Sequence, residues 1–191
     1  MFYTIPRANT NEIAHELIGR FGSLKDVFEA DTQVLKEAYG MGETSATFIK
    51  FIGDLYRYLL VSVTSKKKVI GTTADAGEYI KTFFEGYHHE IFMAFFVDKG
   101  NRVLGWEKIC EGGIDEVKVD PCDIMKAFFK YKAYGVIIAH NHPGGSVIPS
   151  KSDVDSTHIL SDALKYFNLK ILDHVVVADG NYISFSEMHL L

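Results

Sequence analysis

Two apolar runs of strand length most constrain how this chain can fold. Residues 90–97 read EIFMAFFV, and residues 135–139 read GVIIA. Uninterrupted apolar runs of this length are typical of buried strands, because a strand with one face in water would alternate with polar residues. A turn signal at residues 98–101, DKGN, follows the first run and predicts an antiparallel partner strand over residues 102–110. Together these features predict a sheet with helices on its faces.

The patterning on either side of these runs divides the chain. Residues 1–68 show only helical patterns and predict a small all-α helical module. Residues 69–191 mix the two periodicities and predict an α/β (α+β) domain with a mixed β-sheet. In this second domain we expect helices over 73–87, 121–131 and 150–167 and further strands over 116–119, 169–178 and 182–185.

Composition and charge narrow the class of protein. The chain has 191 residues, of which 47% are hydrophobic and 24% charged, so it can bury a core and is not a disordered sequence. No signal peptide or spanning segment is recognisable, so we expect a cytoplasmic protein. Cys110 and Cys122 predict neither a disulfide framework nor a cysteine zinc site. The net charge of −5 comprises +1 in residues 1–68 and −6 in residues 69–191. The triplet Lys66-Lys67-Lys68 near the boundary is interpreted as a solvated linker, and a phosphate-contacting patch is the alternative.

The segment Ala139-His140-Asn141-His142-Pro143 lies where the second apolar strand is expected to end. In extended backbone, residues i and i+2 project to the same side, so His140 and His142 can present two imidazoles to one point. Ser150 is expected to cap the following helix, which places the Asp153 carboxylate in its first turn. Two imidazoles and one carboxylate suit zinc and leave its fourth position for water. The alternative is a pair of histidines hydrogen-bonded at a strand end.

These residues also resemble a known family. The pattern H-x-H-P followed by S-x-x-D is similar to the JAMM (JAB1/MPN/Mov34) metalloprotease signature, and more closely to the RadC (UPF0758) family. The resemblance covers about residues 70–191 and rests on these segments: His140-Asn141-His142-Pro143, Pro149-Ser150-Lys151-Ser152-Asp153, Val119-Asp120-Pro121, Leu172-Asp173-His174 and Glu90-Ile91-Phe92. Two positions depart from the family pattern: Gly144 replaces the usual serine, and Pro121-Cys122-Asp123 replaces P-R-E.

The resemblance implies a JAMM/cytidine-deaminase-like fold and a zinc-dependent peptidase or isopeptidase acting on a peptide or isopeptide substrate. It implies that His140, His142 and Asp153 are the zinc ligands. Glu90 would be the general acid/base on the zinc-bound water, and Ser150 would help to stabilise the tetrahedral oxyanion.

Sequence proximity alone leaves other glutamates open for the acid/base role. Glu85, Glu107 and Glu111 are the alternatives to Glu90. Asp173-His174 invites a supporting role near the metal, but a histidine within an apolar strand is equally typical of a core residue. We therefore place His174 outside the site at this stage.

The N-terminal module carries a second, weaker functional signal. Gly40 and Gly42 resemble the glycines of a helix-hairpin-helix, in which backbone N–H groups approach a DNA phosphate. Residues 20–24, RFGSL, are also similar to RadC-type proteins. Glu43 in the hairpin would repel phosphate, and a balance of +1 over residues 1–68 supplies little counterion release. The alternative function is thus a DNA-associated protein, in repair or mobile-element biology, with a structural or vestigial metal site.

Overall fold

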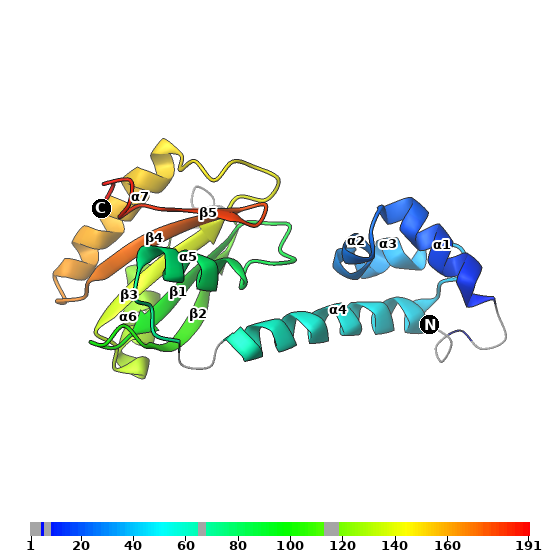
Figure 1. Ribbon diagram of the computed structural model, residues 1–191, viewed down its shortest axis with the longest axis horizontal. Coiled ribbons are helices and arrows are strands. Elements are labelled where there is room, and N and C mark those ends of the chain that lie inside the picture. Colours follow the sequence, from blue (N-terminus) through cyan, green and yellow to red (C-terminus); the bar gives the residue numbers. More distant parts are fainter. Residues whose placement is uncertain (1–4, 6–8, 65–67, 113–118) are drawn as a thin grey trace. The chain divides into compact units, whose positions relative to one another are not determined.

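The computed structural model describes residue 5 and residues 9–64, 68–112 and 119–191. Contacts along the chain divide it into two compact units, residues 1–60 and 61–191 (Figure 1). The sequence patterns predicted the boundary at residue 68. Within the described part of the chain, no helix combines the length and apolarity needed to cross a membrane.

The first unit is helical. It contains α1 (Thr10–Phe21), α2 (Leu24–Glu29), α3 (Thr32–Lys36) and the start of α4 (Glu43–Thr64). Each of the three short helices begins at a side-chain cap that accepts a backbone N–H of its first turn; the caps are Asn9, Ser23 and Asp31. Their apolar faces meet in one small core, whose buried members are Ile13, Leu17, Val27, Leu35, Ala38, Ala46 and Ile49.

The second unit is built on a five-stranded mixed sheet of order β2-β1-β3-β4-β5. Its strands are β1 (Ile91–Val97), β2 (Val103–Glu111), β3 (Gly135–Asn141), β4 (Ile171–Ala178) and β5 (Asn181–Ser184). β1 pairs antiparallel with both β2 and β3, β3 pairs parallel with β4, and β4 pairs antiparallel with β5. The prediction of a mixed sheet flanked by helices, preceded by a helical module, is confirmed.

Helices cover both faces of this sheet, which explains the two continuous apolar runs. All seven residues of β1 and all seven of β3 are buried. One face packs with α5 (Thr73–Lys81) and the turn that follows it, through residues such as Tyr79 and Phe83. The other face packs with α6 (Pro121–Tyr131) and α7 (Lys151–Lys165), through residues such as Ile124 and Leu164. Alternate residues of β1 and of β3 therefore pack into two different cores, one on each face of the sheet.

The expected helix over residues 73–87 is wrong in its second half. α5 ends at Lys81, and the next backbone bonds join residues three apart, from the Phe83 N–H to the Ile80 carbonyl and from the Phe84 N–H to the Lys81 carbonyl. Gly86 then adopts a left-handed φ of +78°, which turns the chain toward β1. Both phenylalanines remain buried against the sheet.

The second apolar strand is longer than expected, and two predicted features lie largely outside the described residues. The second apolar strand continues to Asn141 instead of ending at residue 139, because Asn141 pairs with Val177 of β4 and the His142 N–H donates to the Val177 carbonyl. The expected strand at 116–119 and the lysine triplet at 66–68 lie largely outside the described residues.

Candidate metal centre

The predicted ligands meet where β3 ends and α7 begins. His140 is the penultimate residue of β3, His142 follows the strand, and Asp153 lies in the first turn of α7. His140 and Asp153 are buried, whereas the side chain of His142 is 18% exposed. The parallel β3–α7–β4 crossover brings the carboxyl end of β3 to the amino end of α7, the position at which α/β sheets bind ligands.

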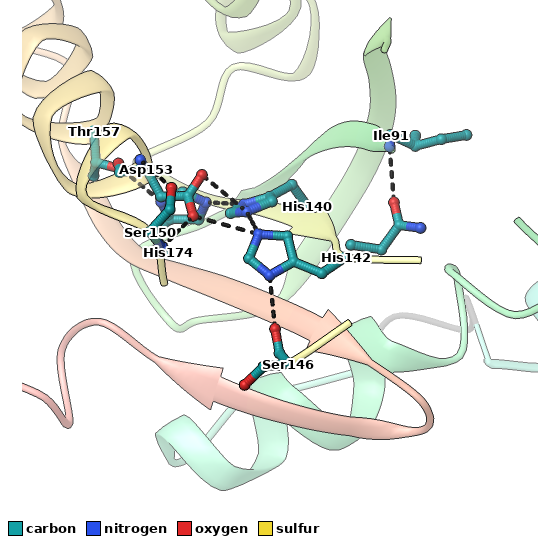
Figure 2. A network of polar contacts seen from close by, with 9 residues as sticks. Ile91, His140, His142, Ser146, Ser150, Asp153, Thr157 and His174 are labelled. Carbon is teal, nitrogen blue, oxygen red and sulfur yellow. Dashed lines mark hydrogen bonds and ion pairs between the residues drawn. The ribbon is translucent and has the colours of Figure 1, made fainter. Parts of the chain in front are cut away.

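Three donor atoms converge at this point (Figure 2). The Nε2 atoms of His140 and His142 are 3.0 Å apart. The two carboxylate oxygens of Asp153 lie 3.3 Å from these nitrogens, Oδ1 from His140 and Oδ2 from His142. Two imidazole nitrogens at this separation can bind one zinc ion at its usual bond lengths of about 2.0–2.1 Å, and a carboxylate that contacts both of them can supply a third ligand. The spacing and the chemistry of the donor set therefore fit a metal ion such as zinc.

The loop after β3 holds His142 in a form that can bind a metal. Its Nδ1 is 2.7 Å from the backbone carbonyl of Ser146. A carbonyl only accepts hydrogen bonds, so Nδ1 carries the proton and Nε2 of the neutral ring keeps its lone pair. The carboxylate of Asp153 also raises the pKa of His142, against the effect of burial, and the negative charge of Glu90 adds a smaller contribution.

Asp153 is held by the helix cap that the sequence predicts. The Ser150 N–H donates to Asp153 Oδ2 at 2.7 Å, and the Asp153 N–H donates to Ser150 Oγ at 3.1 Å, which forms a capping box. Burial by itself would raise the pKa of the Asp153 carboxyl, but its contacts with His140 and His142 outweigh burial and hold the pKa well below the usual range. The carboxylate is therefore ionised and oriented toward both histidines.

Comparisons with known proteins identify the family of this chain. Residues 70–190 match the RadC-like JAB domain. This chain belongs to the RadC family. A UPF0758 protein of Nitrosococcus oceani is 33% identical over 180 residues, which cover 94% of this chain and 80% of the relative. A UPF0758 protein of Vibrio vulnificus is 34% identical over 179 residues, with the same two coverages. A UPF0758 protein of Fusobacterium nucleatum is 32% identical over 196 residues, or 99% of this chain and 84% of the relative.

Behind the candidate metal centre of this RadC-family chain lies His174, which the sequence pattern alone did not assign to the site. His174, in β4, is fully buried, and its Nε2 lies 2.8 Å from Nδ1 of His140. Burial, and then the neighbouring His140, hold the pKa of His174 well below its usual value. The two histidines are 34 residues apart in the sequence, and the pairing of β3 with β4 brings them into contact.

Asn141, between His140 and His142, fixes the backbone on either side of Glu90. Its side-chain Oδ1 accepts the Ile91 N–H at 2.7 Å, and its Nδ2 donates to the His89 carbonyl at 3.1 Å. Glu90 directly precedes β1, and its charge acts on His142. Sequence reasoning missed this role of Asn141, although its position between the two histidines makes it the residue that faces the other side of the strand.

The other candidate glutamates have different surroundings. Glu107 of β2 accepts bonds from Lys130 at 2.6 Å and from the Tyr131 hydroxyl at 2.9 Å, both on α6. Glu111 pairs with Lys108, and Glu85 is exposed in the turn after α5. Of the four carboxylates, Glu90 is the one that contributes to the pKa of His142.

The two glycines of the N-terminal hairpin each have a structural role within the helical unit. Gly40 has a left-handed φ of +72°, and a Cβ there would lie 2.7 Å from Cδ1 of Ile13. The Gly42 N–H donates to Ser45 Oγ at 2.9 Å, inside the hairpin. A role of Gly40 and Gly42 in contact with DNA stays a prediction.

Proposed function

We propose that this RadC-family chain is a zinc-dependent hydrolase that cleaves an amide bond in a peptide or isopeptide substrate. The observation that carries the proposal is the convergence of two imidazole nitrogens and one carboxylate at the end of β3. Three protein ligands leave the fourth tetrahedral position open, as in catalytic zinc sites and unlike closed structural ones.

Zinc held by His140, His142 and Asp153 would polarise a substrate carbonyl and lower the pKa of a water molecule to about 7. The remaining steps belong to side chains of the protein. Glu90 accepts the proton that the attacking water loses and passes it to the nitrogen of the leaving amine. The two bonds from Asn141 to the flanking backbone hold Glu90 at the start of β1 while it does so.

Ser150 supplies a donor for the developing oxyanion. Its Oγ accepts the Asp153 N–H with a lone pair, so the hydroxyl hydrogen can point toward substrate. The capping box fixes Ser150 against the ligand Asp153, which keeps this donor close to the reacting carbonyl. One short segment thus contributes a metal ligand and an oxyanion donor.

The test combines metal content with cleavage. Purified full-length chain is analysed for bound zinc by mass spectrometry and then incubated with a proteome-derived peptide library, in which new amino groups are tagged and sequenced. We expect about one zinc per chain, cleavage that is lost with a chelator and restored by zinc, and loss of zinc in His142→Ala.

A carboxylate variant separates chemistry from metal binding. Glu90→Gln should keep zinc but lose roughly 10²–10⁴-fold in cleavage rate, the contribution typical of a general acid or base. The exposed Glu85→Gln serves as the matched control and should retain both. Zinc-free wild-type protein, or a Glu90→Gln variant as active as Glu85→Gln, would contradict the proposal.

A further inference from the structure

A chain of three hydrogen bonds runs from His140 into the core (Figure 2). His140 Nδ1 lies 2.8 Å from His174 Nε2, and His174 Nδ1 lies 2.6 Å from the Thr157 hydroxyl oxygen. The Thr157 hydroxyl in turn donates to the backbone carbonyl of Asp153 at 2.5 Å. The three linked side chains are 0–2% exposed.

The donor and the acceptor of each hydrogen bond follow from the last bond of the series, between Thr157 and the Asp153 carbonyl. The Asp153 carbonyl can only accept, so Thr157 uses its single hydroxyl hydrogen there. The Thr157 oxygen must then accept from His174 Nδ1, because two acceptors without a hydrogen between them would repel at 2.6 Å. The proton of a neutral His174 is therefore on Nδ1, and its Nε2 carries a lone pair.

The surroundings of His174 favour the neutral ring. The ring of Phe185 lies 4.4 Å from it and that of Phe92 5.9 Å, measured between ring centroids. The carboxylate of the adjacent Asp173 is occupied by Ser184 Oγ and by the backbone N–H groups of Ser186 and of His174 itself. Burial between aromatic rings disfavours an imidazolium ion.

We propose that His174 and Thr157 are positioning residues that fix His140 in its Nδ1–H tautomer and so keep its Nε2 lone pair free for the metal. His140 Nδ1 donates to the lone pair of His174 Nε2, and its own Nε2 faces Asp153 and the Nε2 of His142. The two facing lone pairs, 3.0 Å apart, repel each other, and a metal ion bound to both would remove this repulsion. The inference rests on the proposed metal site but not on its catalytic activity.

His140 and His142 thus both carry their ring proton on Nδ1, but their Nδ1 atoms donate to different partners. His142 donates directly to the carbonyl of Ser146, whereas the buried His140 reaches a carbonyl through two side chains. That carbonyl belongs to Asp153, the third ligand, one helical turn before Thr157. These three hydrogen bonds therefore connect β3, β4 and α7 around the donor atoms.

The alternative tautomer would block the site. With a proton on Nε2, His140 would donate across the 3.0 Å gap to His142 and could not bind a metal. Thr157→Val removes the hydroxyl at nearly constant shape and leaves His174 free to place its proton on Nε2. His174 would then donate to His140 Nδ1 and move the His140 proton to Nε2. Thr157→Ser keeps the hydroxyl and is the matched control.

The experiment has two readouts on the full-length chain, neither of which is activity. Long-range proton–nitrogen NMR spectra of ¹⁵N-histidine-labelled, zinc-free protein report which ring nitrogen carries the proton, and His140→Gln assigns the His140 signal. Zinc affinity is measured by competition with a chelating dye. We expect the Nδ1–H tautomer of both His140 and His174 in the wild type. Thr157→Val should bind zinc roughly 10–100-fold more weakly, the usual effect of losing such a partner, and Thr157→Ser should bind like the wild type.

The wild-type spectrum alone tests the tautomer, so the inference does not depend on the folding of a variant. A His140 proton on Nε2 in the wild type would overturn it. A folded Thr157→Val chain with wild-type tautomers and zinc affinity would overturn it as well. If both readouts agree with expectation but no peptide is cleaved, the proposed hydrolase function fails and the positioning role of His174 and Thr157 stands.

Discussion

Replacing Asn141 by leucine removes both bonds that hold the start of β1 while keeping a side chain of similar size. The amide of Asn141 is 4% exposed and accepts the N–H of Ile91, a residue that is fully buried. A buried N–H left without a partner costs about 1–3 kcal/mol. The carbonyl of the exposed His89 can bond to water instead, so its loss adds only about 0.5 kcal/mol. The expected loss of stability is therefore about 1.5–3.5 kcal/mol.

Urea unfolding measures this loss. The only tryptophan, Trp106, lies in β2 with its ring 5.3 Å from that of Phe83, so its fluorescence reports the second unit. Asn141→Leu should lower the urea midpoint with an unchanged dependence of unfolding free energy on urea, because the surface exposed on unfolding is the same. In a thermal scan the melting temperature should fall by about 3–14 °C, at about 2–4 °C per kcal/mol for a chain of this size.

The control is the same substitution at an exposed asparagine. Asn181 lies in β5, and its side chain bonds the Asp179 carbonyl at 3.3 Å in the turn. Asn181→Leu should change stability by no more than about 0.5 kcal/mol. If Asn141→Leu is as stable as Asn181→Leu, the two bonds do not hold the backbone around Glu90 and the reasoning is refuted.

Three further predictions concern the second unit. Zinc at 100 times its dissociation constant should stabilise the folded chain by about 2.7 kcal/mol, and His142→Ala should abolish this shift in a thermal scan. The bond from Lys130 holds the pKa of Glu107 below its usual value. Its stabilisation is therefore present above the unfolded pKa and lost as pH falls through the folded one, so Glu107→Gln should cost about 0.5–1 kcal/mol near pH 7 and nothing in strong acid, measured by urea unfolding. Gly105→Ala would place a Cβ 2.1 Å from the Tyr131 ring and should destabilise by about 1–3 kcal/mol in the same assay; equal stability would show that Tyr131 moves freely.

Local patterns in the sequence determined the two central strands, the start of α7 and the three candidate metal-binding side chains. The apolar runs predicted β1 and β3 because strands buried on both faces need no polar residues. The spacing of His140 and His142 placed both rings on one side of the backbone, since side chains alternate along a strand. Ser150 and Asp153 could be predicted at the start of α7 because a helix cap depends on residues three apart. Each of these relations is local, so one sequence suffices to predict it.

Only the tertiary structure decided what supports these residues. His174 contacts His140 because β4 lies parallel to β3, a pairing across 34 residues that no local spacing encodes. Asn141 holds the backbone around Glu90 because β1 pairs antiparallel with β3 across 50 residues. The end of α5 at Lys81 was likewise missed, since Phe83 and Phe84 continue a helical apolar pattern but pack on the sheet from a turn. The candidate ligands follow from the residue types in one segment, whereas the hydrogen bonds that orient them depend on which strands lie side by side.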